Sequence, residues 1–279
     1  MRVLRSAAMA ALALALSASI GAASSEHPPE VEKAPEKIAA ISAKPSIPAP
    51  HGGAPHWDYQ GLGGPVNWGK LEPGFAACEG GATQSPINLA PTLSADLPPI
   101  YFNYAATPTA VSNNGHTLQV NVFEGSTIMV DGKEFPLVQF HFHTPSEYQI
   151  DGKSFPLEIH FVHKNPQGVL AVIGVMVKEG AANSELETIF AAAPREAGRT
   201  QQMPDAFTDV RKLLPAAATY YRLMGSLTTP PCSEGVHWHV MTTPIEASKA
   251  QIDKFRTYYS MNARPLQPAN NRLVVKDSR

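Results

Sequence analysis

Two stretches decide the fold and carry most of the chemistry: Gln139-Phe140-His141-Phe142-His143 and Glu158-Ile159-His160-Phe161-Val162-His163. Both are rich in aromatic and β-branched residues, which favours β-strands. Side chains alternate across a strand, so His141 and His143 project from the same face, together with Gln139. The first strand therefore presents two imidazoles and an amide side by side.

A turn between the two stretches indicates that the strands pair with each other. Asp151-Gly152 is a two-residue hairpin signal. Pairing that continues outward from this turn without a slip places His143 opposite His160, close enough for three imidazoles to converge. Pro145 and Pro156 interrupt the ladder, so a bulge there would shift this register.

The histidine pattern predicts a metal site. Three neutral imidazoles that leave a fourth position open are typical of catalytic zinc, whereas calcium and magnesium prefer oxygen ligands. His141 and His143 supply two ligands, and the second strand offers His160 or His163 as the third. Glu158 favours His160, because a carboxylate on the same strand face can orient a zinc-bound imidazole.

An internal repeat points the other way. Residues 131–137 read Asp-Gly-Lys-Glu-Phe-Pro-Leu, and residues 151–157 read Asp-Gly-Lys-Ser-Phe-Pro-Leu. Overlaying the two units superposes His143 on His163, so the repeat alone favours His163 as the third ligand. We interpret the repeat as two successive hairpins of similar build.

Further motifs make the chain resemble the α-class carbonic anhydrases. They follow the family's order over roughly residues 54 to 277 and comprise His56-Trp57-Asp58-Tyr59, Gln84-Ser85-Pro86-Ile87-Asn88, Asn113-Asn114-Gly115-His116, Gly225-Ser226-Leu227-Thr228-Thr229-Pro230-Pro231 and Asn271-Arg272. The resemblance implies zinc held by His141, His143 and His160, against His163. It also implies reversible hydration of CO2 to bicarbonate and a proton by zinc-bound hydroxide, with ester hydrolysis as a side activity.

The resemblance also assigns roles around the metal. Gln139, Glu158 and Asn271 would orient the zinc ligands His141, His160 and His143 in that order. Thr228 and Glu147 would form the gate that orients the hydroxide, and Thr229 would touch the substrate. The apolar CO2 pocket would consist of Val162, Val172, Leu227 and Trp238. His116 would be the proton shuttle, with Tyr59, Asn114 and Gln119 ordering the relay water.

Turn-forming residues between short strand-like segments predict a β-dominated α+β fold. We expect one domain over residues 54–279, with a central twisted, mostly antiparallel sheet and a few peripheral short helices. Strands are expected at 101–104, 117–123, 127–130, 137–143, 157–162, 170–178 and 236–242. Helices are expected from 183 or 184 to 192, from an Asp205 cap through 214, and from the capping box Thr243-Pro244-Ile245-Glu246 to 259.

The N-terminal residues predict export. Residues 1–23 read as a secretory signal peptide, with Arg2 and Arg5 before an alanine-rich apolar run and small residues at its end. An uncleaved membrane anchor is the alternative, but the run is short. Residues 24–53 are rich in proline and alanine and predict a disordered linker. We therefore expect a periplasmic or secreted protein with no membrane association after cleavage.

Net charge and cysteine content limit the possible binding partners and the redox state of the protein. The formal net charge is −2, from 22 Lys and Arg against 24 Asp and Glu, and no basic cluster favours nucleic acid. In an exported chain Cys78 and Cys232 could form one disulfide, as bacterial family members commonly do; two buried thiols are the alternative. Expected partners are CO2 and bicarbonate, and a homodimer is compatible with the sequence. The rival function is an acatalytic binding module on the same fold, which usually lacks a zinc histidine; none is lacking here.

Overall fold

The computed structural model describes residues 56–279. The predicted signal peptide (1–23) and linker (24–53) lie outside this range. Within it, no helix has both the length and the apolar character needed to cross a membrane.

The described part consists mainly of strands. The strands are β1 (Asn88–Leu89), β2 (Leu93–Ala95), β3 (Tyr101–Asn103), β4 (Ala106–Asn113), β5 (Leu118–Asn121), β6 (Thr127–Val130), β7 (Lys133–His143), β8 (Gln149–Ile150), β9 (Leu157–Lys164), β10 (Leu170–Glu179), β11 (Arg199–Asp209), β12 (Tyr220–Ser226), β13 (Glu234–Met241), β14 (Ile245–Ala247) and β15 (Val275–Asp277). The α-helices are α1 (Trp68–Leu71), α2 (Ala77–Gly80), α3 (Ser184–Ala192) and α4 (Lys249–Arg256). Short 3-10 helices lie at η1 (Gly61–Gly63), η2 (Pro65–Asn67), η3 (Pro73–Phe75) and η4 (Val210–Leu213).

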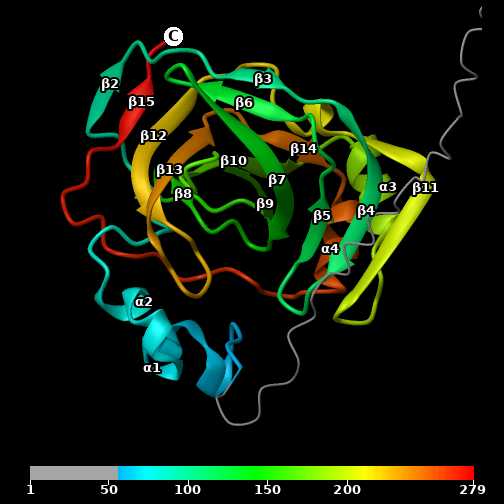
Figure 1. Ribbon diagram of the computed structural model, residues 1–279, viewed down its shortest axis with the longest axis horizontal. Helices are drawn as coiled ribbons and strands as arrows, with labels where there is room; N and C mark the ends of the chain where they lie inside the picture. Colours follow the sequence, from blue (N-terminus) through cyan, green and yellow to red (C-terminus); the bar gives the residue numbers. More distant parts are fainter. Residues whose placement is uncertain (1–55) are drawn as a thin grey trace, which may run out of the picture. The chain divides into compact units, whose positions relative to one another are not determined.

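One large sheet organises these elements (Figure 1). Its strand order is β11-β4-β5-β7-β9-β10-β13-β12-β15-β2, with β3, β6 and β14 paired at its sides. Most neighbours are antiparallel; β10 runs parallel to β13 and β14, and β15 runs parallel to β2. The predicted β-dominated, mostly antiparallel fold with few short helices is confirmed, and every strand expected from the sequence is present.

The central strands separate two buried clusters. β9 and β10 are nearly continuous runs of apolar residues, as expected for strands covered on both faces. Phe140, Phe161 and Ile173 belong to the larger cluster on one face. Val172 and Trp238 belong to a second cluster on the opposite face. The predicted histidine pair therefore lies in the middle of the sheet, where the backbone is held on both sides.

The register between β7 and β9 differs from the expected one. His141, not His143, lies opposite His160, and His143 lies opposite Glu158. The turn itself forms as predicted, since Ile150 and Lys153 exchange backbone hydrogen bonds across it. The ladder is therefore shifted by two residues somewhere between this turn and His143.

The shift has a specific cause in residues 144–148. The backbone N–H groups of Glu147 and Tyr148 donate to Oε2 of Glu158, at 2.7 and 2.9 Å, instead of to a facing strand. Ser146 donates its backbone N–H to Phe155 and receives one from Phe155 at its hydroxyl. This segment bulges out of the ladder, and the pairing resumes two residues out of step.

The repeated sequence forms two similar turns, as predicted. Asp131 and Gly132 have φ values of 49° and 72°, and Asp151 and Gly152 have 49° and 75°. Val130 pairs with Lys133 at the first turn, so the first repeat joins β6 to β7. The equivalence of the two units is local to the turns and does not extend to the histidines.

Two of the three predicted helices are wrong in position. The first, α3, is confirmed, and the side chain of Asn183 caps it by accepting from Glu185 and Leu186 N–H. The helix expected from Asp205 is instead the end of β11, which pairs with β4 and is followed by the short η4. Pairing along the sheet edge outweighs the local capping signal.

The last predicted helix starts later than expected. Residues 245–247 form β14 and pair in parallel with β10, so the capping box at Thr243 is not used. Helix α4 begins instead after Ser248, whose side chain and that of Gln251 form a capping box. Again a strand partner distant in sequence decides the local structure.

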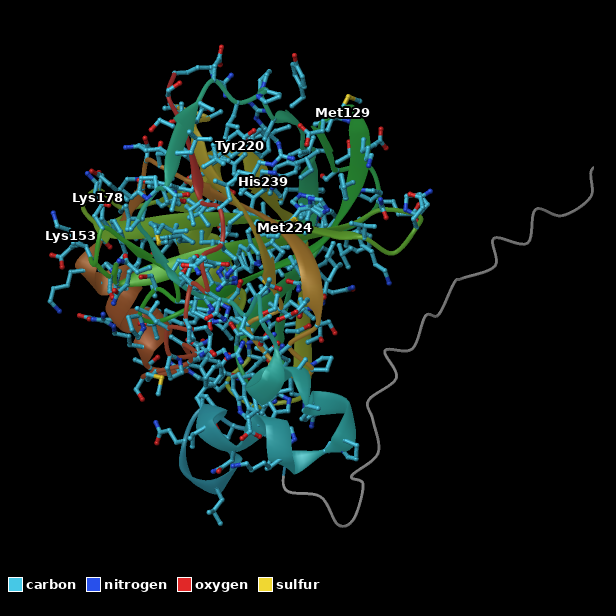
Figure 2. All side chains as sticks on the ribbon, turned by 90° about the vertical axis from the view of Figure 1, so that its left-hand side faces the viewer. Met129, Lys153, Lys178, Tyr220, Met224 and His239 are labelled. Atoms are coloured by element: carbon cyan, nitrogen blue, oxygen red, sulfur yellow. A yellow bond between two sulfur atoms is a disulfide. The ribbon has the colours of Figure 1, made fainter. Side chains whose placement is uncertain are left out.

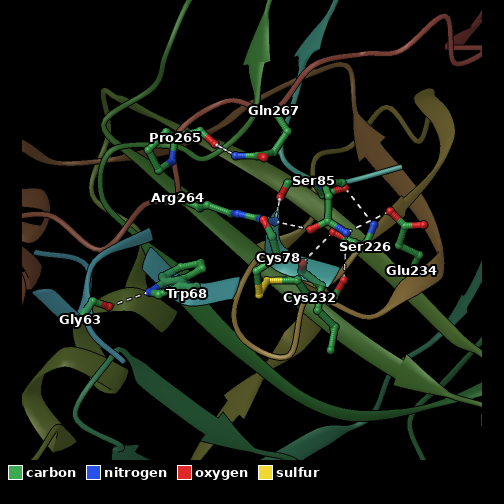
Figure 3. The surroundings of a disulfide bond; sticks show 12 residues. Gly63, Trp68, Cys78, Ser85, Ser226, Cys232, Glu234, Arg264, Pro265 and Gln267 are labelled. Carbon is green, nitrogen blue, oxygen red and sulfur yellow. Dashed lines mark hydrogen bonds between the residues drawn. A yellow bond between two sulfur atoms is a disulfide. The ribbon is translucent and has the colours of Figure 1, made fainter. Parts of the chain in front are cut away.

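The predicted disulfide is confirmed. Cys78 and Cys232 are bonded across 154 residues of sequence, beside a cluster that includes Tyr59 and Trp68 (Figure 3). The guanidinium of Arg264 lies in the same region and donates to the backbone carbonyl of Cys78 at 2.8 Å. The bond therefore fixes the N-terminal segment against the loop that precedes β13.

Candidate metal centre

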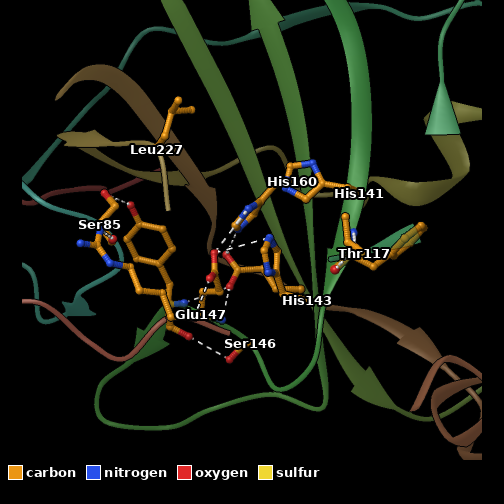
Figure 4. A network of polar contacts seen from close by, with 12 residues as sticks. Ser85, Thr117, His141, His143, Ser146, Glu147, His160 and Leu227 are labelled. Atoms are coloured by element: carbon orange, nitrogen blue, oxygen red, sulfur yellow. Dashed lines mark hydrogen bonds and ion pairs between the residues drawn. The ribbon is translucent and has the colours of Figure 1, made fainter. Parts of the chain in front are cut away.

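Three imidazoles converge on one point at the middle of the sheet (Figure 4). His141, His143 and His160 each offer a ring nitrogen, and these atoms lie within 4.8 Å of one another. No other group of three such ligands occurs among residues 56–279. The arrangement follows from strand geometry: the two β7 histidines are two residues apart, and His160 lies directly opposite His141.

Two of the imidazoles are oriented by the residues expected from the sequence. Nδ1 of His141 lies 2.9 Å from Oε1 of Gln139, and Nε2 of His160 lies 3.0 Å from Oε1 of Glu158. These contacts leave Nε2 of His141 and Nδ1 of His160 facing the centre. Such partners fix the ring orientation and the tautomer of a metal-bound histidine.

The third imidazole is held by a residue that the sequence did not indicate. Nδ1 of His143 donates to the backbone carbonyl of Asn262 at 2.8 Å. Nε2 of His143 is buried and has no hydrogen-bond partner within residues 56–279. The prediction that Asn271 serves this ligand is wrong, because Asn271 is an exposed turn residue with φ of 58°.

The electrostatics suit a bound cation. Burial lowers the pKa of His143 to about 4 and that of His160 to about 3, and it also lowers the pKa of His141 well below its usual value. All three rings are therefore neutral near pH 7, which is the form that binds a metal. Three nitrogen ligands that leave a fourth coordination position open favour zinc. The orphaned ring nitrogen of His143 and its neighbours fit this ion.

Two buried carboxyl groups adjoin the site. Burial raises the pKa of Glu158 to about 8, although the two backbone N–H groups that donate to this carboxyl group lower it. Burial also raises the pKa of Glu147, whereas His143, the Arg264 N–H and the Thr228 hydroxyl lower it. A divalent cation held by the three rings would lower the pKa of both carboxyl groups, because it favours the ionised carboxylates.

Glu147 lies beside the nitrogens that face the centre. Its Oε2 is 3.5 Å from Nε2 of His143 and 3.8 Å from Nδ1 of His160, while its Oε1 accepts from Arg264 N–H at 2.8 Å. The Thr228 hydroxyl is one of the groups that lower the pKa of this carboxyl group, although Oε2 of Glu147 has no hydrogen-bond partner within residues 56–279. The structure thus brings together Thr228 and Glu147, the pair expected from the sequence.

A cavity of about 120 Å³ opens in front of the rings. Its lining contains five residues expected near the metal, namely Tyr59, Asn114, His116, Gln119 and Thr229. The side-chain amides of Asn114 and Gln119 form hydrogen bonds within the protein. The Asn114 side chain accepts from the backbone N–H groups of His116 and Thr117, and Gln119 donates to Asn121.

His116 lines this cavity and packs against two other rings. Its ring is parallel to Trp57 within 10°, with centroids 3.6 Å apart, and its centroid lies 4.9 Å from that of His56. Burial, and then the charge of His56, lower the pKa of His116 to about 4. In this position the ring is neutral near pH 7.

The apolar residues expected from the sequence gather on the other side of the metal ligands. Val172 pairs with Val162 on β9 and with Trp238 on β13. Leu227 packs against the same cluster. The Trp238 ring lies 4.8 Å from that of His160. These residues therefore form an apolar wall beside His160.

Sequence reasoning missed Asn262 and Arg264. The Asn262 side chain accepts from Thr144 N–H and donates to the carbonyls of His116 and Phe142. Arg264 links Glu147 to the disulfide region through the bonds described above. Neither residue belongs to a periodic element. The only sequence signal for them is an asparagine close before an arginine. The same pattern occurs at Asn271-Arg272, and the ligand-orienting role was predicted there.

Comparisons with known proteins agree with this geometry. A family model described as eukaryotic-type carbonic anhydrase matches residues 63–278. The carbonic anhydrase of Pectobacterium carotovorum is 48% identical over 223 residues, covering 79% of this chain and 90% of that protein. The Thermovibrio ammonificans α-carbonic anhydrase, solved with the inhibitor sulfanilamide, superposes with a TM-score of 0.77 at 46% identity, covering 81% and 100% of the two chains. The Photobacterium profundum α-carbonic anhydrase gives a TM-score of 0.75 at 47% identity, covering 79% and 100%. The chain belongs to the eukaryotic-type, or α-class, carbonic anhydrase family.

Proposed function

We propose that this chain is a zinc-dependent carbonic anhydrase that interconverts CO2 and bicarbonate. The observation that carries the proposal is the convergence of His141, His143 and His160, whose ligand nitrogens lie within 4.8 Å of one another. A zinc ion held there lowers the pKa of a bound water and so supplies a nucleophile near neutral pH, an effect for which carbonic anhydrases are the standard example.

The residues beside the ligands would position the substrate. CO2 has no dipole, so it is best held by an apolar wall next to the nucleophile. Val162, Val172, Leu227 and Trp238 provide such a wall against His160. Thr229, which lines the cavity on the other side, would contact the substrate or bicarbonate.

Thr228 and Glu147 would select the hydrogen-bonding pattern at the open position. An ionised Glu147 can only accept hydrogen bonds, so it commits the Thr228 hydroxyl to donate toward it. The oxygen of Thr228 is then left as an acceptor toward the cavity. It would orient a ligand that carries a proton and disfavour anions that carry none. The lowering of the Glu147 pKa by the Thr228 hydroxyl supports this role.

His116 would carry the proton between the cavity and the solvent. A histidine titrates closest to neutral pH and can accept and release the proton in turn. Tyr59, Asn114 and Gln119 line the same cavity and would order the water that connects His116 to the open position. In the stacked position, the low pKa of His116 favours release of the proton to buffer and disfavours its uptake.

The compartment proposed from the sequence is the periplasm or the exterior of the cell. The Cys78–Cys232 disulfide supports an oxidising environment. CO2 and bicarbonate are the proposed partners, together with a homodimer as the assembly to be tested by sedimentation. Activity toward activated esters is the proposed side reaction of the same centre.

The decisive experiment combines metal analysis with a CO2 hydration assay. The purified protein should contain one zinc per chain and accelerate hydration, and a chelator should abolish the activity reversibly. His160→Ala should lose zinc, whereas His163→Leu, on the opposite face of the same strand, should retain it. Stoichiometric zinc without faster hydration would refute the proposal and favour an acatalytic binding module.

A further inference from the structure

A second cavity lies on the face of the sheet opposite the metal centre. It measures about 120 Å³ and is lined by residues of three segments: the β6–β7 turn, the β9–β10 connection and β13. On β13, Trp238 packs against His160, so His237 and His239 project from the other face. We call this cavity the back pocket; no residue lining it belongs to the proposed catalytic centre.

The back pocket contains a buried polar side chain with nothing to satisfy it. His239 is 1% exposed, and neither of its ring nitrogens has a hydrogen-bond partner within residues 56–279. Tyr220 packs edge-on against the ring at 5.3 Å (Figure 2), but its hydroxyl donates to the carbonyl of Pro98. A buried donor without a partner is costly, so a group that fills the pocket and accepts from His239 would stabilise it.

The charge around the back pocket favours an anion. Lys133 lines the pocket and forms no ion pair within residues 56–279, while Asp131 is already bound to Arg222 at 2.6 Å. Burial is the largest cause that lowers the pKa of His237 and His239; Arg222 lowers both further, and Lys133 lowers that of His237 against the opposing effect of Asp131. These cations oppose a metal ion at the two histidines, and the three-ligand cluster that a metal needs is absent from this part of the described chain.

The remaining walls indicate the size and kind of anion. Val130, Phe135, Val169 and Ala171 line the pocket with apolar surface, and its volume admits only a few non-hydrogen atoms. A neutral imidazole offers one N–H donor, and Lys133 offers an ammonium group. A carboxylate can accept from both, and a short alkyl group can occupy the apolar end.

We propose that the back pocket binds a small monocarboxylate, whose carboxylate accepts from His239 and Lys133 and whose alkyl end contacts Phe135 and its apolar neighbours. Bicarbonate shares the planar oxyanion chemistry but has no alkyl end. The apolar walls therefore favour a short organic acid over bicarbonate. Comparing the affinities of the two kinds of anion distinguishes between them.

The test follows the imidazole resonances of His237 and His239 in the full-length zinc-loaded protein. Acetate, propionate and bicarbonate are titrated separately at constant ionic strength, and His239→Phe assigns the His239 signals. The proposal predicts saturable shifts of both histidines, with propionate bound at least as tightly as acetate and both tighter than bicarbonate.

The internal repeat supplies a matched control. Lys133→Gln should weaken binding about tenfold, as expected for the loss of one charge-assisted hydrogen bond. Lys153→Gln removes the lysine at the equivalent position of the second turn, which does not line the pocket, and should leave binding unchanged. Both lysines are exposed, so these variants should fold. Absence of saturable shifts, equal weakening by the two variants, or tighter binding of bicarbonate would overturn the proposal.

Discussion

The imidazole of His116 lies flat against the indole of Trp57, with ring centroids 3.6 Å apart and planes 10° from parallel. This contact buries much of the ring that is proposed to export the proton. Burial is the largest cause of the low pKa of His116, about 4. The stacked ring therefore holds a proton poorly.

Removal of the indole should raise the pKa of His116. In Trp57→Ala the ring becomes more exposed, the charged form is better solvated, and the pKa should move from about 4 toward 6.5. Trp57→Phe, which keeps an aromatic face, should move it less. Titration of the His116 imidazole by NMR measures both. An unchanged pKa in the alanine variant would show that stacking does not control this group.

Loss of the His116 imidazole should slow turnover in a buffer-dependent way. With His116→Ala, the decrease in kcat should be largest in weak buffer, and small imidazole buffers should restore the rate, because they replace the missing proton acceptor. The ratio kcat/KM for CO2 should change little. A loss that no buffer restores would argue that His116 acts on structure or binding rather than on proton export.

The carboxylate behind His160 should matter for zinc affinity. Glu158 is fully buried and lies 3.0 Å from Nε2 of His160, so Glu158→Gln removes the charge that supports this ligand. Loss of such a partner typically weakens metal binding about 10- to 100-fold. Competition with a chelator measures the affinity. Glu134→Gln, on the exposed part of β7, is the control and should bind zinc as the parent does.

Asn262 and Asn271 should behave differently. Asn262 is fully buried and fixes both Thr144 and the loop of His116, so Asn262→Ala should lower the free energy of unfolding by about 1–3 kcal/mol and weaken zinc binding. Asn271→Gly, which keeps the φ of 58° accessible, should change neither, since the Asn271 side chain is exposed. Urea unfolding and chelator competition measure the two effects. Weaker zinc binding in Asn271→Gly would instead support Asn271 as the partner of His143.

The buried His163 should make the protein sensitive to acid. Its ring is neutral, accepts from the Tyr104 hydroxyl and donates to the Ala171 carbonyl, and burial lowers its pKa to about 3. The unfolded chain, with a pKa near 6.5, binds a proton that the folded chain does not. Stability from this group is therefore complete above pH 6.5 and falls as the pH falls toward 3, by up to about 1.4 kcal/mol per pH unit.

Replacement of His163 should flatten this dependence. His163→Leu loses the Tyr104 hydrogen bond at every pH, which lowers its stability by a constant amount, but it no longer differs in proton uptake at this position. The difference in unfolding free energy between the parent and the variant should shrink between pH 6 and pH 4. Urea unfolding at several pH values tests this, and parallel curves would contradict the assigned pKa.

Local sequence determined the chemistry of the metal centre. The two-residue spacing of His141 and His143 places both rings on one face of any strand, and the same rule joins Glu158 to His160. The Asp151-Gly152 turn is likewise local, because its backbone conformation depends on the residues within it. For that reason these features were predictable without knowledge of the fold.

Tertiary structure decided which groups meet. Residues 144–148 leave the ladder, where the Glu158 carboxylate accepts from the N–H groups of Glu147 and Tyr148. As a result His141 rather than His143 lies opposite His160. The carbonyl that orients His143 comes from Asn262, 119 residues away. β11, which replaces a predicted helix, is largely exposed and polar, so only its pairing with β4 identifies it as a strand. Periodicity and capping depend on neighbours in sequence, whereas register, backbone partners and edge strands depend on competition among groups that only the folded chain brings together.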